Sequence, residues 1–330
     1  MCNIRNHNSW GHKHNPDLAT EKAKDLVRMA VAKVALMEPL NETEFEVNQN
    51  ALVVGGGVAG LTVAKNLSLQ GYLTHVVEKS DALGGQANKI YQTADGNLFA
   101  PELKHLVEEV TANENVKIHL NSELKDVEGF VGNFKSTVAS NGDKTEIDHG
   151  IAVIATGGKP HTPTEYQYGQ DPRVITSLML DQKIMENDSA LKELDTAVFI
   201  QCVGSREPDR PYCSKVCCTH SIDNALTLKK LNPSMKIFVL YRDIRTYGER
   251  EYLYKAARDQ GVIFMRYTLD AKPQVKVDGD QLVVDLVDPI LGRPVSISTG
   301  LLCLATAVIP NSDEKLAQLF KVPVNDDGFY

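Results

Sequence analysis

From residue 51 onward, the hydrophobic pattern of the chain alternates short apolar runs with amphipathic stretches. Ala51–Val54 is a continuous apolar run that predicts a buried strand, and residues Val58 to Gln70 keep helical spacing until Gly71. Leu73–Val77 predicts a second strand. A strand, a helix and a strand in this order predict a βαβ unit with two parallel strands.

The same alternation starts again in the second half of the chain. Ala197–Val203 and Lys236–Tyr241 predict strands, and Ser214–Leu231 between them predicts a helix. Each half then ends in a β-rich segment and an apolar strand, Ile151–Ala155 in the first half and Leu301–Ala305 in the second. We therefore predict an α/β protein with two doubly wound, Rossmann-like domains of the dinucleotide-binding type.

The residues before the first strand form a separate polar segment. Asn15-Pro16 is typical of a helix start, and apolar residues at helical spacing predict an amphipathic helix that ends near Glu38-Pro39. The predicted organisation thus has an N-terminal helical segment, a first domain and a second domain. Their predicted bounds are 1–50, then 51–160 together with about 300–330, and 161–299.

Composition and charge exclude several classes of function. The 330 residues carry 35 Lys plus Arg against 43 Asp plus Glu, a formal net charge of −8, so nucleic acid is not an expected partner. The apolar runs are far shorter than the ~20 residues of a membrane helix, which predicts no membrane span. No apolar segment follows Met1, so we expect no secretory signal and a cytoplasmic location.

The turn between the first predicted strand and helix contains the pattern G-x-G-x-x-G. It reads Gly55-Gly56-Gly57-Val58-Ala59-Gly60. We expect Gly55 to allow a tight turn, Gly57 to let a pyrophosphate approach the backbone, and Gly60 to let the helix pack closely on the sheet. The N-terminus of the helix would stabilise the anion.

Glu78 ends the second predicted strand of this βαβ unit. A carboxylate at this position accepts hydrogen bonds from the ribose hydroxyls and disfavours a 2′-phosphate. A glycine-rich turn without a ligand is the alternative interpretation. Strand, helix and acid together favour a bound dinucleotide.

Six cysteines lie in the chain, and four of them fall within 17 residues. These four are Cys202, Cys213, Cys217 and Cys218. In a reduced chain such crowding favours metal or redox chemistry over disulfides. If the residues from 214 onward are helical, Cys213 and Cys217 share one face near the helix N-terminus, where the dipole and the adjacent Lys215 and Arg206 favour thiolates.

Four thiolates suit either an iron–sulfur cluster or a zinc ion with an all-cysteine shell. Zinc sites usually present two C-x-x-C pairs, which this spacing lacks, and two adjacent cysteines fit poorly around one tetrahedral ion. A 4Fe–4S cluster accepts ligands from divergent directions and is the favoured interpretation. Four reduced core cysteines without a metal are the remaining alternative.

Short motifs near the glycine turn resemble those of two-domain flavoproteins of the thioredoxin reductase type. They are Glu78-Lys79, Leu83-Gly84-Gly85-Gln86 and Ala155-Thr156-Gly157. The resemblance implies FAD in the first domain, held by Gly55, Gly57, Val58, Ala59, Gly60, Glu78, Lys79, Gly85, Gln86, Ala155, Thr156 and Gly157. In such flavoproteins the second domain binds NADPH at another glycine-rich turn. Here that place reads Gln201-Cys202-Val203-Gly204-Ser205-Arg206, which disfavours a nicotinamide nucleotide.

Nearly the whole chain resembles the HdrA family of heterodisulfide reductase, the flavin and iron–sulfur subunits of methanogens and many anaerobes. The matching segments include Asn3-Ile4-Arg5, Ser9-Trp10, Thr20–Leu40, Arg210-Pro211-Tyr212-Cys213 and Val216-Cys217-Cys218-Thr219-His220. The resemblance implies a non-standard 4Fe–4S cluster on Cys202, Cys213, Cys217 and Cys218. It also implies a multi-subunit complex with other heterodisulfide reductase-type subunits, an electron donor such as hydrogenase or ferredoxin, and flavin-based electron bifurcation.

The chain departs from this family in several respects. Asn8 stands where a cysteine often precedes Ser-Trp, and ferredoxin-like C-x-x-C-x-x-C-x-x-x-C modules are missing. The chain also stops where relatives continue the FAD domain, so it resembles a truncated member in which weaker FAD binding is expected. Cys2 has no assigned role, and Cys303 is predicted to be a buried core residue.

Two alternative functions remain open. One is a docking or scaffold module that keeps the fold without its own flavin, and the other is a quinone-interacting oxidoreductase A-like subunit. An ordinary NAD(P)H-dependent disulfide reductase is disfavoured, because the C-x-x-C redox pair and the second glycine pattern are both missing. No residue is assigned as a catalytic acid or base, and we expect His220 to be a neighbour of the cysteine site rather than a ligand.

Overall fold

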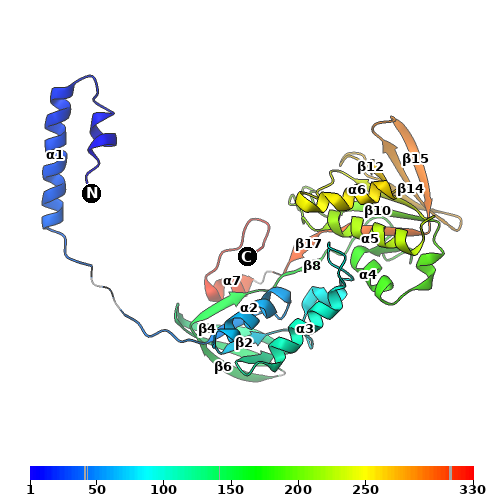
Figure 1. Ribbon diagram of the computed structural model, residues 1–330, viewed down its shortest axis with the longest axis horizontal. Helices are drawn as coiled ribbons and strands as arrows, with labels where there is room; N and C mark the ends of the chain where they lie inside the picture. Colours follow the sequence, from blue (N-terminus) through cyan, green and yellow to red (C-terminus); the bar gives the residue numbers. More distant parts are fainter. Residues whose placement is uncertain (41, 43, 141, 312–313) are drawn as a thin grey trace. The chain divides into compact units, whose positions relative to one another are not determined.

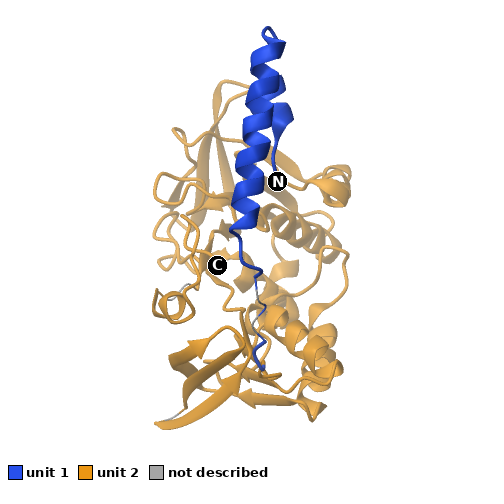
Figure 2. Cartoon of the chain, turned by 90° about the vertical axis from the view of Figure 1, so that its left-hand side faces the viewer, with its two compact units in different colours: residues 1–46 blue, residues 47–330 orange. Residues whose placement is uncertain are grey.

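The structure is a computed structural model of the chain, and it describes residues 1–40, 42, 44–140, 142–311 and 314–330. They form two compact units, Met1–Glu46 and Val47–Tyr330, which are coloured separately in Figure 2. The predicted boundary at residue 50 is therefore slightly late. Asn48 already belongs to the second unit, because its backbone N–H donates to the carbonyl of Gly132.

The described residues of the first unit form the short π-helix η1 (Arg5–Ser9) and the helix α1 (Pro16–Ala35). As the sequence predicts, Asn15 caps α1 by accepting a hydrogen bond from the N–H of Leu18. The buried Asn8 fastens η1 to α1, since its amide donates to the carbonyl of Ala19 at 2.6 Å. Asn8 is thus a polar tie between the two helices.

The first domain of the second unit is built on a parallel sheet with the strand order β3-β2-β1-β7. Its strand β2 and helices α2 and α3 are labelled in Figure 1. Its strands are β1 (Ala51–Val54), β2 (Thr74–Val77), β3 (Val116–His119) and β7 (Ile151–Ile154). Its helices are α2 (Val58–Leu69), η2 (Gly85–Lys89) and α3 (Phe99–Ala112). Val53 and Val76 pack with Leu61 of α2 and Val110 of α3, so these two helices cover one face of the sheet.

An antiparallel meander covers the opposite face. Its strands are β4 (Ser122–Phe130), β5 (Asn133–Ser140) and β6 (Asp143–His149). Leu52 and Val54 of β1 pack with Val138 and Ile147 of the meander and with Leu316 of α7 (Glu314–Phe320). β1 is buried on both faces, which is why its apolar run is continuous rather than alternating.

The second domain repeats this plan with a parallel sheet in the order β12-β11-β10-β16-β9. Its strands are β9 (Val174–Thr176), β10 (Thr196–Val203), β11 (Lys236–Tyr241), β12 (Ile263–Arg266) and β16 (Leu301–Thr306). Its helices are α4 (Ser177–Met185), η3 (Ser189–Lys192), α5 (Cys217–Leu231), η4 (Gly248–Arg250) and α6 (Glu251–Asp259). A second meander packs on the other face, with strands β13 (Gln274–Asp278), β14 (Gln281–Asp288) and β15 (Arg293–Thr299).

The two domains are connected by a pair of antiparallel strands, β8 (Gly158–Pro160) and β17 (Val308–Pro310). The predicted return to the first domain at about residue 300 is therefore too early, because β16 pairs with β10 and β9 in the second sheet. The chain leaves the second domain only after Thr306. Two α/β domains with parallel sheets confirm the predicted fold class.

Candidate dinucleotide site and cysteine cluster

The glycine-rich turn has the geometry that each of its three glycines requires. Gly55 has a φ of 115°, and a Cβ there would lie 2.3 Å from the carbonyl oxygen of Ala155. A Cβ at Gly60 would lie 1.9 Å from the carbonyl oxygen of Gly55, so only glycine fits this close approach. A Cβ at Gly57 would meet no described atom within 4 Å. The space beside Gly57, at the N-terminus of α2, is therefore open to a ligand.

A second glycine segment lies against this turn. The N–H of Gly84 donates to the carbonyl of Gly56 at 2.8 Å, and Gly57 forms a β-bridge with Gly84. Gly85 and Gln86 then begin η2. The structure thus brings the predicted residues Gly57, Gly85 and Gln86 to one edge of the first sheet.

Glu78 is largely buried at the end of β2, and its carboxylate is held by the chain itself. Oε2 accepts from the backbone N–H of Gly56 at 2.7 Å, and Oε1 accepts from both the N–H and the hydroxyl of Ser80. Burial raises the pKa of Glu78, but the hydrogen bonds from Ser80 and Gly56 outweigh it and the pKa is lowered. The carboxylate is ionised and fixed beside the glycine turn.

A cavity of about 270 Å³ opens beside Glu78, at the carboxyl ends of β1 and β2. Its walls combine the predicted residues Gly55, Glu78, Lys79 and Thr156 with two that the sequence did not single out, Lys125 and Asn311. Asn311 holds the segment after β7 with two hydrogen bonds. Its side-chain amide donates to the carbonyl of Thr156, and its backbone N–H donates to the carbonyl of Gly157. The carboxyl ends of parallel strands are the usual ligand side of such sheets.

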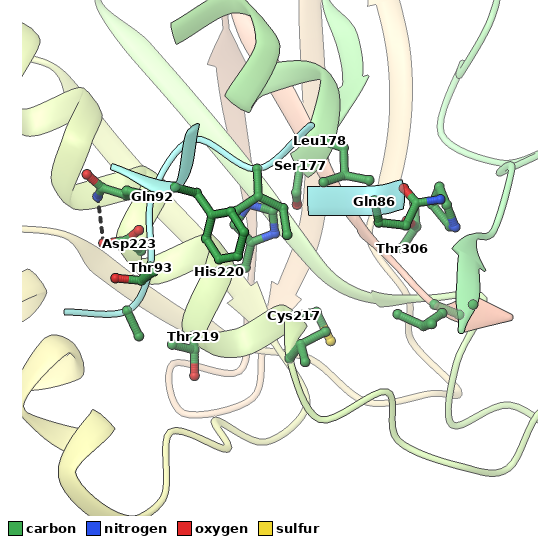
Figure 3. A pocket seen from close by; sticks show the side chains of 18 of the residues that line it. Gln86, Gln92, Thr93, Ser177, Leu178, Cys217, Thr219, His220, Asp223 and Thr306 are labelled. Carbon is green, nitrogen blue, oxygen red and sulfur yellow. Dashed lines mark hydrogen bonds between the residues drawn. The ribbon is translucent and has the colours of Figure 1, made fainter. Parts of the chain in front are cut away.

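A larger cavity of about 610 Å³ lies between the two domains of the second unit (Figure 3). The first domain contributes Gln86, Gln92 and Phe99 to its walls, and the second contributes Ser177, Cys217 and His220. The strands β8 and β17, which connect the domains, complete the lining with Gly158–Pro160 and Val308. The cavity thus joins the neighbourhood of the glycine turn to the cysteine-bearing helix α5.

Two buried acids of the second domain hold the first-domain loop that lines this cavity. Asp181 of α4 accepts from the N–H of Tyr91 at 3.1 Å and lies 2.8 Å from Nε2 of His220. His220 is therefore oriented by Asp181.

Asp223 of α5 provides the second link. It accepts from the amide of Gln92 at 2.8 Å (Figure 3). The same amide donates to Thr227. Burial raises the pKa of Asp223, while the hydrogen bond from Gln92 acts in the opposite direction. Sequence reasoning missed Asp181, Gln92 and Asp223. The available signal was the polar composition of α5, which buries Thr219, Ser221, Asp223, Asn224 and Thr227.

The four clustered cysteines lie at the carboxyl end of β10 and around the start of α5. Cys202, Cys217 and Cys218 are buried, and Cys213 is half-buried in the preceding loop. The expectation that Cys213 and Cys217 share a helical face is wrong, because α5 begins only at Cys217. Lys215 has a φ of 65° and donates its N–H to Sγ of Cys213, which keeps this segment out of the helix.

The four thiols interact electrostatically. The hydrogen bond between Cys217 and Cys218 raises the pKa of Cys217 and lowers that of Cys218, and negative charge on Cys202 or Cys213 raises the pKa of Cys217 further. Burial raises the pKa of Cys202, against the charges of Arg242 and Arg206. In the described part of the chain, no three His, Cys, Asp or Glu side chains are arranged to hold a metal ion. Cys303 is fully buried in β16, which confirms its prediction as a core residue.

The residues present fit a dinucleotide by their chemistry, whereas the described cysteine side chains are not arranged as a metal site. Open space at Gly57, the fixed carboxylate of Glu78 and the adjoining cavities suit a dinucleotide. Near the thiols, two buried guanidinium N–H groups, Nη1 of Arg206 and Nε of Arg242, have no hydrogen-bond partner among the described residues. Buried donors of this kind require an acceptor that the described residues do not supply.

Comparison with known families identifies a match over more than half of the chain. The sequence profile described as pyridine nucleotide-disulphide oxidoreductase matches residues 14–189. Among solved structures, thioredoxin reductase from T. acidophilum is similar with a TM-score of 0.56 and 15% identity, covering 84% of this chain and 83% of that chain. Thioredoxin reductase from Lactococcus lactis has a TM-score of 0.55 at 16% identity, over 85% and 83% of the two chains. These structures share the fold.

Curated relatives are more similar in sequence. The HdrA subunit of the H(2):CoB-CoM heterodisulfide,ferredoxin reductase of Methanothermobacter marburgensis is 30% identical, and the iron-sulfur HdrA subunit of CoB-CoM heterodisulfide reductase of Methanocaldococcus jannaschii is 29% identical. Both alignments include 100% of this chain but 64% of the relative's length. They extend over 429 and 431 positions, so the relatives carry internal segments that this chain lacks. The resemblance to HdrA is confirmed. None of the helices within the described ranges is long and apolar enough to cross a membrane.

Proposed function

Because the chain belongs to the pyridine nucleotide-disulphide oxidoreductase family, we propose that it is an electron-transfer flavoprotein subunit of the HdrA type. One observation carries the proposal. Cys217 lines the same 610 Å³ cavity as Gln86 and Gly158, which flank the predicted flavin residues Gly85 and Gly157. A flavin ring and a sulfur-ligated group could therefore share one enclosed space.

The first domain would hold FAD. The open N-terminus of α2 at Gly57 would receive the pyrophosphate, and Glu78 and Lys79 would border the ribose in the 270 Å³ cavity. Gln86 and Gly158 would border the ring in the larger cavity. When bound, the flavin supplies one- and two-electron chemistry, and the chain supplies binding, orientation and electrostatics.

The second domain would hold a 4Fe–4S cluster on Cys202, Cys213, Cys217 and Cys218. The burial of three of these thiols and the unpaired buried N–H groups of Arg206 and Arg242 support this assignment. Such a cluster carries single electrons. A reducing, cytoplasmic location follows from the same proposal, because the ligands must stay reduced.

We further propose that electrons pass between this chain and partner subunits of the heterodisulfide reductase type, with hydrogenase or ferredoxin as donor. The names of the relatives at 29–30% identity include both a heterodisulfide and a ferredoxin. Division of electron pairs between two such acceptors is the expected role of the flavin in the assembled complex.

Anaerobic reconstitution of the full chain with FAD, iron and sulfide tests the proposal. We expect about four irons and one flavin per chain, with iron lost in Cys217→Ser and retained in Cys303→Ala, whose thiol lies in the core of the second domain. Saturable FAD binding without iron would overturn the cluster. If neither group binds, the chain is a docking module that keeps only the fold.

A further inference from the structure

The parallel sheet of the first domain has an apolar edge at β7. In the described part of the chain, β7 pairs with β1 on one side and with no strand on the other. Its sequence is Ile-Ala-Val-Ile, of which Ile151 is 47% exposed and the other three residues are half-buried. The opposite edge strand, β3, carries Lys117, and charged residues protect edge strands from further pairing. β7 has no such protection.

The second domain shows what occupies the same position in its own sheet. The strand order β12-β11-β10-β16-β9 repeats the order β3-β2-β1-β7 and adds β9 beyond β16. β16 pairs with β10 from Leu301 onward as β7 pairs with β1 from Ile151 onward, so the two strands are equivalent. With β9 on its outer side, β16 is buried from Leu301 to Ala305. Among the described residues, the first sheet has no counterpart of β9.

The backbone of β7 presents hydrogen-bonding groups at this edge. The N–H of Ala155 donates to the last residue of β1. Alternate residues of a strand bond to the same neighbour, so the N–H and C=O groups of Ala152 and Ile154 point away from β1. In β16 the N–H equivalent to that of Ala152 belongs to Leu302, and it donates to the carbonyl of Arg173 just before β9 at 2.9 Å. An added strand would form the same bond at β7.

We propose that the outer edge of β7 binds an extended apolar segment of a partner polypeptide, which completes the first sheet as β9 completes the second. β9 reads Val-Ile-Thr and is buried, so the expected segment is a short run of β-branched residues that lies parallel to residues 152–154. A second copy of this chain fits less well. Two copies related by a two-fold axis would set their β7 strands antiparallel, whereas β9 lies parallel to β16.

This inference deepens the proposed function and rests on it for the existence of a partner subunit. β7 leads directly into the predicted flavin residues Ala155, Thr156 and Gly157. A strand bound beside β7 would therefore stabilise the segment that enters the dinucleotide site. The edge itself is formed by the chain alone, so its test needs neither FAD nor iron.

The first test titrates the full chain, without added cofactors, with a fluorescent synthetic peptide of residues 171–178, which contain β9. Fluorescence anisotropy should show saturable binding. Ala152→Pro removes an N–H that points away from β1, so the variant should fold and bind the peptide roughly fivefold more weakly or worse. Ile118→Pro makes the equivalent change at β3, the opposite edge, and is the control that should bind like the wild type.

Urea unfolding shows whether the variants fold. If Ala152→Pro does not, Ile151→Lys replaces it, because a charge at the exposed start of β7 should also block pairing. Residue-resolved hydrogen exchange gives a second readout. Binding of the peptide should slow exchange at Ala152 and Ile154 and leave Val153, whose N–H faces β1, unchanged.

Three results would overturn the proposal. They are the absence of saturable binding, equal binding by the wild type and the β7 variants, and a wild-type dimer that Ala152→Pro converts to a monomer. The last result would assign the edge to a second copy of the chain. A chain that binds the peptide at β7 but takes up neither FAD nor iron would contradict the proposed function alone.

Discussion

The carboxylate of Glu78 and the backbone N–H of Gly56 are joined by a hydrogen bond of 2.7 Å. This bond ties the end of β2 to the turn after β1, so the acid of the βαβ unit and its glycine turn form one rigid edge. Ser80 completes the arrangement by donating both its N–H and its hydroxyl to the other carboxylate oxygen. The shape of the predicted dinucleotide site therefore depends on Glu78 even before a ligand binds.

Replacing Glu78 by alanine should weaken both the fold and the binding of FAD. The substitution leaves the N–H groups of Gly56 and Ser80 without their acceptors, at a cost of about 1–3 kcal/mol. The affinity for FAD, measured by fluorescence titration, should fall roughly tenfold or more, because the turn loses its support and the ribose its acceptor. Glu109→Ala, which removes a carboxylate paired with Lys65 on the partly exposed surface, is the control and should bind FAD normally.

Two glycines of the turn should respond differently to the same substitution. Gly60→Ala should lower the free energy of unfolding by several kcal/mol, since its Cβ would lie 1.9 Å from a backbone oxygen. Gly57→Ala should fold like the wild type, because its Cβ meets no described atom within 4 Å, yet it should lose FAD binding. Urea unfolding and FAD titration together distinguish the two effects. Normal FAD binding by Gly57→Ala would show that no phosphate approaches this residue.

The sequence predicted the parts of the fold that depend on local patterns. The strand at Ala51–Val54 and the helix from Val58 appear at these positions because a buried parallel strand must be apolar on both faces and a glycine turn must precede the helix. The domain boundary was harder to place. The run at Leu301–Thr306 has the composition of an inner strand in either sheet, and only its pairing with β10 assigns it to the second domain.

The start of α5 could not be predicted, for a similar reason. Residues 212–216 contain no glycine or proline that would end a helix. Tyr212, however, donates its hydroxyl to the carbonyl of Val308, and the hydroxyl of Ser214 accepts from the N–H of Val308. These contacts come from β17, almost a hundred residues further along the chain. They hold the segment in a loop and separate Cys213 from the helix that bears Cys217.

The link between Gln92 and Asp223 should contribute to the stability of the interdomain cavity. Gln92→Ala removes the amide that bonds both Asp223 and Thr227 and leaves a buried carboxylate unpaired, which should cost about 1–3 kcal/mol at neutral pH. Asp223→Asn should cost little or stabilise the chain, because the pKa of Asp223 is raised and its charged form is disfavoured in the fold. Urea unfolding of both variants measures which of the two substitutions lowers the free energy of unfolding more. A larger loss in Asp223→Asn than in Gln92→Ala would contradict it.

The histidine pair on β2 and β3 predicts a loss of stability in acid. Nδ1 of His75 lies 3.0 Å from Nε2 of His119. Burial lowers the pKa of His75 from its ordinary value of 6.5 to about 4, and the charges of His119, Lys117 and His149 act in the same direction. Burial also lowers the pKa of His119.

A lowered pKa in the fold means that the unfolded chain takes up the proton first as the pH falls. The contribution of His75 to stability is therefore complete above about pH 6.5 and is lost as the pH falls toward 4. Urea unfolding from neutral to mildly acidic pH should show this loss in the wild type and a flatter profile in His75→Gln. His105→Gln, which removes an exposed histidine on α3, should keep the wild-type profile. Parallel profiles for the wild type and His75→Gln would mean that other groups cause the acid sensitivity.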